Sequence, residues 1–117
     1  MPLTPQQQSA LNEIDQIIVV RRNVMARLKA ARASTTDPQV LSDLKSARIA
    51  ITRKNLVTVN ARNRILRSAS LGPTLTKLKS LTNDAKAADK AMANLDKVLK
   101  QATTLIQILG RLASILA

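Results

Sequence analysis

The chain has 117 residues and a formal net charge of +12, and it contains no Cys, His, Phe, Trp or Tyr. Without Cys and His it can form no disulfide framework, no thiolate nucleophile, no structural zinc site and no histidine acid–base pair. Without aromatic rings it lacks the platforms on which nucleic-acid bases commonly stack. An apolar fraction of 45%, with only 2 Gly and 4 Pro, predicts one folded domain over residues 1–117 that is poor in β-hairpins.

The first predicted helix covers about residues 5–33. Thr4 followed by Pro5 is a typical N-cap with proline at the first helical position. At 100° per residue, one side of this helix is an apolar stripe. The stripe consists of Leu11, Ile14, Ile17, Ile18, Met25 and Leu28.

The second predicted helix covers about residues 38–70. Asp37 and Pro38 repeat the start signal of the first helix. Because residues 34–37 form a short connection, the first two helices are expected to make an antiparallel hairpin. Gly72 is suited to a left-handed C-cap, and Pro73 prevents continuation of the second helix.

The third predicted helix covers about residues 74–116 and has an unbroken apolar heptad from Leu78 to Leu116. One straight helix of this length would be about 64 Å long, against about 45 Å for each of the others. A break near residues 82–84, where Thr82, Asn83 and Asp84 supply possible N-caps, is the alternative to a projecting helix. We favour the continuous helix. The fold class predicted is all-α: an antiparallel hairpin plus a long third helix, as an elongated three-helix bundle or a coiled-coil-like assembly.

Arg21 lies in the middle of the apolar stripe of the first helix. The facing side of the second helix carries Asn55, Thr58 and Arg62, also among apolar positions. One interpretation is a polar layer that sets the register of the hairpin at some cost in stability. The other is an incompletely buried hairpin in which Arg21 and Arg62 face a partner or an anion.

A second basic feature is a polar stripe on the second helix. Arg53, Asn60, Arg64 and Arg67 fall within about 60° of one another, and the planar guanidinium group is suited to bidentate contact with phosphate. These charges are either an ordinary solvated surface or a polyanion contact. The candidate anion-binding residues are therefore Arg53, Arg64, Arg67, Arg21 and Arg62.

The end of the third helix is apolar over an arc of about 200°, which is too wide for one neighbour to cover. The expected explanations are a helix buried centrally, a surface for self-association or docking, or membrane insertion. If the helix serves self-association, docking or membrane insertion, the candidate residues of that surface are Leu105, Ile108, Leu112 and Ile115.

The sequence predicts a non-enzymatic protein with no catalytic residue, metal site, cofactor or small-molecule substrate. The favoured function is self-assembly through the third helix together with sequence-independent binding of an anionic partner, foremost the nucleic-acid backbone. The alternatives are a membrane-active helical protein and a scaffold subunit with an acidic protein partner. No Sec signal peptide and no clear membrane-spanning segment is recognisable, which leaves the cytoplasm and signal-peptide-independent export both open.

Overall fold

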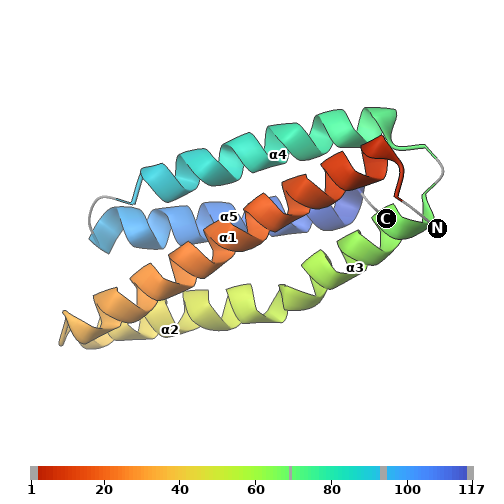
Figure 1. Cartoon of the computed structure of the whole chain (residues 1–117). Coiled ribbons are helices and arrows are strands. Elements are labelled where there is room, and N and C mark those ends of the chain that lie inside the picture. The colour runs from red at the N-terminus through yellow and green to blue at the C-terminus, as the bar shows by residue number, and fades with distance from the viewer. Residues whose placement is uncertain (1–2, 69, 93–94, 116–117) are drawn as a thin grey trace.

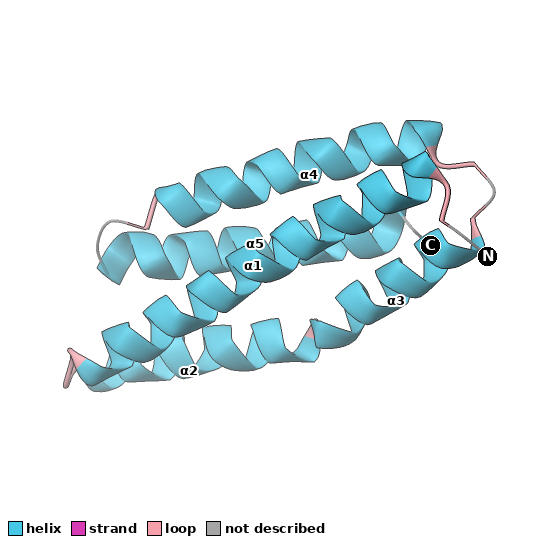
Figure 2. Cartoon of the chain, viewed as in Figure 1, coloured by secondary structure: helices cyan, strands magenta, loops and turns pink. Residues whose placement is uncertain are grey.

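The structure, a computed structural model, describes residues 3–68, 70–92 and 95–115. Helices account for 89% of these residues, and there is no strand among them, so the all-α prediction is confirmed. The helices are α1 (Pro5–Ala33), α2 (Pro38–Arg53), α3 (Asn55–Arg67), α4 (Gly72–Lys90) and α5 (Leu95–Ile115). Short connections join the helices, as Figure 2 shows.

Both predicted helix starts are confirmed, and the cap geometry explains them. The hydroxyl oxygen of Thr4 accepts a hydrogen bond from Gln7 N at 3.1 Å, and Gln7 Oε1 accepts one from Thr4 N at 2.9 Å. This reciprocal pair satisfies two backbone donors that the first turn of α1 leaves free. At the start of α2, Asp37 Oδ1 accepts from Gln39 N at 2.9 Å.

The second predicted helix is interrupted at Lys54, where a continuous helix was expected. Lys54 N donates to Ile51 O at 3.0 Å, and Lys54 O accepts from Val57 N at 3.0 Å, so the backbone tightens to an i to i+3 pattern. The sequence has neither Pro nor Gly at this point, although β-branched side chains nearby lower its helix propensity. The two segments follow one another as one bent rod, which we call the α2–α3 rod (Figure 1).

The third predicted helix is also divided, and the expectation of one projecting helix is wrong. The alternative prediction, a break near residues 82–84, is wrong as well. Thr82 lies buried inside α4, and its hydroxyl donates to Leu78 O at 3.0 Å. The chain instead leaves α4 at Ala91 and returns as α5, with residues 93 and 94 outside the described part. Folding back buries the apolar seam of each half against the other, which removes more apolar surface from water than a projecting helix would.

The resulting bundle has four rods and measures 52 × 23 × 21 Å. α1 and α4 run in one direction, and the α2–α3 rod and α5 run in the other, so α1 begins and α5 ends at the same end (Figure 1). Among the described residues, α4 contacts α1 and α5 but neither α2 nor α3. The segment from α3 to α4 therefore crosses one end of the bundle diagonally.

Two glutamines of α1 hold this crossing segment. Gln7 Nε2 lies 3.3 Å from Ile65 O and 3.4 Å from Ser68 O, so it donates to carbonyls at the end of α3. Gln6 Oε1 accepts from Leu71 N at 3.3 Å, and the Leu71 side chain is buried. The left-handed C-cap expected at Gly72 is not formed, because Gly72 begins α4 and has no positive φ.

The wide apolar arc at the end of the chain belongs to the core, which corrects its assignment as an exposed assembly or membrane surface. Leu105, Ile108 and Leu112 are no more than 1% exposed within the single chain, and Ile115 is half-buried. The arc is wide because α5 contacts all four other helices. Several neighbours share an arc that one neighbour could not cover.

Candidate nucleic-acid interface

The basic charge is concentrated where acidic residues are missing. Between Asp43 and Asp84 the sequence has no Asp or Glu, and in these 40 residues it has nine Lys or Arg. This acid-free span includes most of α2, all of α3 and the first half of α4. Seven of the nine lie within residues 38–67, where Asp43 is the one acid, and like charges so close together repel one another unless an anion lies nearby.

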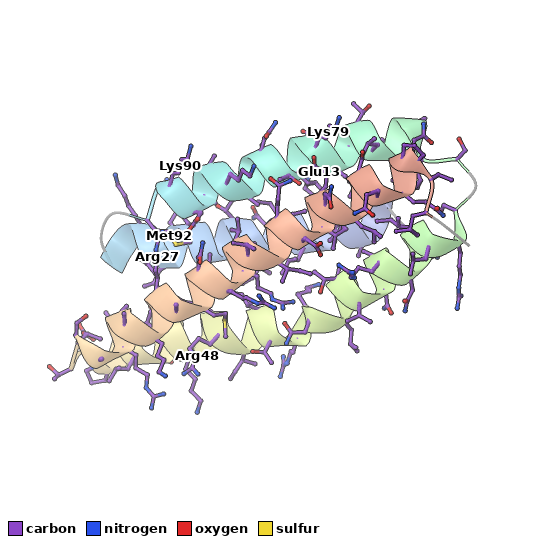
Figure 3. The ribbon with its side chains drawn as sticks, viewed as in Figure 1. Glu13, Arg27, Arg48, Lys79, Lys90 and Met92 are labelled. Carbon is purple, nitrogen blue, oxygen red and sulfur yellow. The ribbon has the colours of Figure 1, made fainter. Side chains whose placement is uncertain are left out.

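Three of the predicted anion-binding residues lie exposed on the α2–α3 rod. Arg53, Arg64 and Arg67 are solvent-exposed, and no carboxylate of the described residues lies within ion-pair distance of any of them. Arg48, one helical turn before the end of α2, also extends away from the bundle, as Figure 3 shows. These guanidinium groups are free to contact phosphate oxygens without first breaking an internal ion pair.

Arg64 and Arg67 stand at the edge of a hollow of about 350 Å³ between α3 and α5. Asn60 lies one turn before Arg64 on the same side of α3 and also lines this hollow. Small or apolar side chains complete it. The full lining consists of Val57, Asn60, Ala61, Asn63, Arg64, Arg67, Leu112 and Ala113. We call it the α3–α5 hollow; it combines cationic and amide donors at its rim with apolar walls.

Two other hollows differ from it in charge. One lies between α2 and α5 and includes Asp43, and another lies between α4 and α5 and includes Asp84. A carboxylate in the lining disfavours an anionic ligand. A fourth hollow, lined by Lys77, Ser80, Arg111, Ser114 and Ile115, also has no acid, but its Arg111 pairs with Asp84 at 3.2 Å. Of the four, the α3–α5 hollow is the one with two arginines that have no acidic partner among the described residues, which suits it to a phosphate group.

An apolar ridge borders the hollow on the outer side of the rod, and the sequence reasoning missed it. It is formed by exposed Leu56, Val59 and Leu66 of α3 and Ile49 of α2. Leu56 is 68% exposed, the largest value among the exposed large apolar residues. Their spacing of three or seven residues was visible in the sequence, but the same spacing is expected of residues that face the core.

Arg21 and Arg62 are placed differently from the other candidates, because both have partners within the chain. Arg21 Nη1 donates to the hydroxyl of buried Thr58 at 3.2 Å, and Arg62 pairs with Asp15 of α1. Burial, followed by the neighbouring charge of Arg22, lowers the pKa of Arg21. The contact with Thr58 favours the interpretation of Arg21 as part of a polar layer between α1 and α3.

Replacing Arg21 with Leu should raise the free energy of unfolding by about 1 kcal/mol, because an apolar side chain then fills a partly buried position. The Thr58 hydroxyl is left with its own donor bond to Asn55 O at 2.9 Å. Urea denaturation followed by circular dichroism measures the change. A loss of stability instead would show that the Arg21–Thr58 hydrogen bond outweighs the cost of burying the charge.

The remaining ion pairs lie away from the exposed arginines of the rod. Arg27 of α1 pairs with Asp89 of α4 at 3.2 Å, where Asn23 Nδ2 also donates to Asp89 Oδ2 at 3.1 Å. Arg111 of α5 pairs with Asp84 at 3.2 Å. These contacts join α1 and α5 to α4, so Asp84 and Asp89 are paired away from the rod.

No group of three or more acidic residues in the described part of the chain is arranged so that it could hold a metal ion. None of the described helices combines the length and apolarity needed to span a membrane.

Comparison of the chain with protein-family models, curated proteins and solved structures finds no match in any of the three.

Proposed function

We propose that this chain is a non-enzymatic protein that binds the phosphate backbone of nucleic acid through the exposed arginines of the α2–α3 rod. The observation that carries the proposal is the acid-free span, in which Arg53, Arg64 and Arg67 are exposed and have no acidic partner among the described residues. A surface of this kind attracts a polyanion by releasing the counterions condensed on it.

Recognition would be independent of base sequence. The arginines are spread along one side of a helical rod, and no separate element of the described chain extends from it to enter a groove. Contacts to phosphates place a protein on a nucleic acid but do not read the bases. Self-assembly through α5 was expected to use Leu105, Ile108 and Leu112, and these side chains are buried in the core of the single chain. The proposal therefore involves the anionic partner alone.

Binding of fluorescein-labelled 20-mers, one single-stranded and one duplex, tests the proposal by fluorescence anisotropy. We expect binding of at least one of them at about 50 mM salt, with strong weakening by about 200 mM as counterions compete. Absence of binding to both oligonucleotides at the lower salt concentration would refute the proposed function. A salt-independent affinity would refute the phosphate contact on which it is based.

A further inference from the structure

We infer that the nucleic acid bound by the α2–α3 rod is single-stranded, with one nucleotide unit seated in the α3–α5 hollow and neighbouring bases against the apolar ridge. This inference rests on the proposed function and adds the class of strand to it. Two independent features carry it: the chemistry of the hollow and the exposure of the ridge.

The hollow offers two kinds of contact close together. Arg64 and Arg67 at its rim suit a phosphate, and Asn60 supplies an amide that can donate or accept. The accessible apolar part of its lining, half-buried Val57 and exposed Ala113, suits the uncharged part of a ligand. A nucleotide has the same division between a charged phosphate and a much less polar sugar and base.

The shape of the hollow selects against a duplex. In a duplex the phosphates lie on a regular, stiff surface and the bases are stacked inside, so neither a sugar nor a base can enter a recess between two helices. A single strand is flexible, and its unstacked bases can turn away from the backbone. It can therefore place a phosphate at Arg64 and Arg67 while the attached unit enters the hollow.

The apolar ridge leads to the same conclusion from a different observation. Leu56, Val59, Leu66 and Ile49 are exposed on the same rod as the arginines. Against a duplex these side chains would face phosphates and sugars, with no apolar surface to cover. Against a single strand they can cover the faces of bases. Since the chain has no aromatic ring, guanidinium planes and aliphatic side chains are the groups left to contact bases.

The charge around the ridge argues against its being covered by a second copy of this chain. Arg48 and Arg53 come from the rod close in sequence to the ridge, and the acid-free span supplies no carboxylate to a copy packed against it. A second copy would bring these cations together, whereas a single strand neutralises them. The exposed ridge and its basic surroundings therefore both suit a single strand of nucleic acid.

The test compares oligothymidine of 20 nucleotides with a 20-base-pair duplex in the same buffer, using the wild type and three variants of the full chain. Ala113→Met fills the hollow from the exposed side of α5 without changing charge, and Leu56→Gln with Val59→Gln removes apolar surface from the ridge. Ala26→Met, at an exposed position of α1, is the matched control for the added volume. Thermal melts show that each variant is folded before it is measured.

We expect the wild type and Ala26→Met to bind the single strand at least about fivefold more tightly than the duplex. The hollow and ridge variants should each lose about fivefold in affinity for the single strand and little for the duplex. Equal or tighter binding of the duplex by the wild type would overturn this inference while leaving the proposed function standing. Binding of neither strand would refute the proposed function itself.

Two further outcomes would also overturn the inference. If Ala113→Met binds the single strand as the wild type does, the hollow is not the seat of a nucleotide. If vesicles of equal parts phosphatidylglycerol and phosphatidylcholine bind the chain and displace the oligonucleotide, and the ridge variant loses the vesicles alone, the ridge is a membrane contact. Retained single-strand preference in the presence of these vesicles supports the inference.

Discussion

Replacing Leu112 with Gln should lower the free energy of unfolding by about 3–5 kcal/mol. Leu112 is fully buried where α5 packs against its neighbours, so the change removes apolar burial and places an amide in surroundings without assured hydrogen-bond partners. For a domain whose total stability is about 5–15 kcal/mol, this is a large fraction. Urea denaturation followed by far-ultraviolet circular dichroism measures the loss, and it should occur with no change in molecular mass.

Leu56→Gln is the matched control, since it makes the same chemical change at a position that is 68% exposed. Its effect on the free energy of unfolding should stay within about 0.5 kcal/mol. The account of α5 as a core helix would be contradicted if Leu112→Gln kept its stability and light scattering showed that the wild type, but not the variant, is an oligomer. That pair of results would restore the assembly surface expected from the sequence.

Changing Arg53, Arg64 and Arg67 together to Gln should weaken nucleic-acid binding by about tenfold to a hundredfold at about 50 mM salt. Each removed guanidinium group loses its charge-assisted contacts to a phosphate, and no acidic side chain of the described chain is left unpaired by the change. Since all three side chains are exposed, the thermal stability should hardly alter. Fluorescence anisotropy titrations against the wild type give the change in affinity.

The control of equal charge is a triple variant in which Lys29, Lys86 and Lys90 are changed to Gln. All three are exposed and none belongs to the α2–α3 rod, and the two triple variants have the same net charge. Figure 3 shows Lys90 on the outer side of α4. If both variants lose the same affinity for nucleic acid, total charge decides the binding, and the arginines of the rod contribute no more than other cations do.

Local signals in the sequence predicted where α1 and α2 begin. Thr4 with Pro5 and Asp37 with Pro38 act through hydrogen bonds to residues two or three positions away, so the sequence pattern contains the whole interaction. The apolar stripe of the first helix likewise contains buried Leu11, Ile14, Ile17 and Leu28. For such features a short window of sequence is sufficient.

The two helix breaks could not be predicted in the same way. Neither the break at Lys54 nor the turn after Ala91 coincides with Pro or Gly. An unbroken heptad is satisfied both by one long helix with a partner and by two helices folded against each other. What decides between them is how much apolar surface the rest of the chain can cover, and this depends on contacts between distant segments.

The candidate site was predicted in part. The shared side of Asn60, Arg64 and Arg67 followed from helical spacing, and the structure places all three on one hollow. The walls contributed by Leu112 and Ala113 come from α5, which the sequence reasoning had placed on a separate, projecting helix. The apolar ridge was missed because exposure of Leu56 depends on which side of the rod the bundle covers.

The salt dependence of single-strand binding tests the central claim most directly, because its slope counts the phosphates that the protein neutralises. The logarithm of the association constant of the wild type and of the Arg53, Arg64 and Arg67 triple variant is plotted against the logarithm of salt concentration. Each lost contact should reduce the slope by about 0.7 on a single strand, so the triple variant should differ by about 2, and the lysine control by much less. An unchanged slope in the arginine variant would contradict the claim that these side chains contact phosphate.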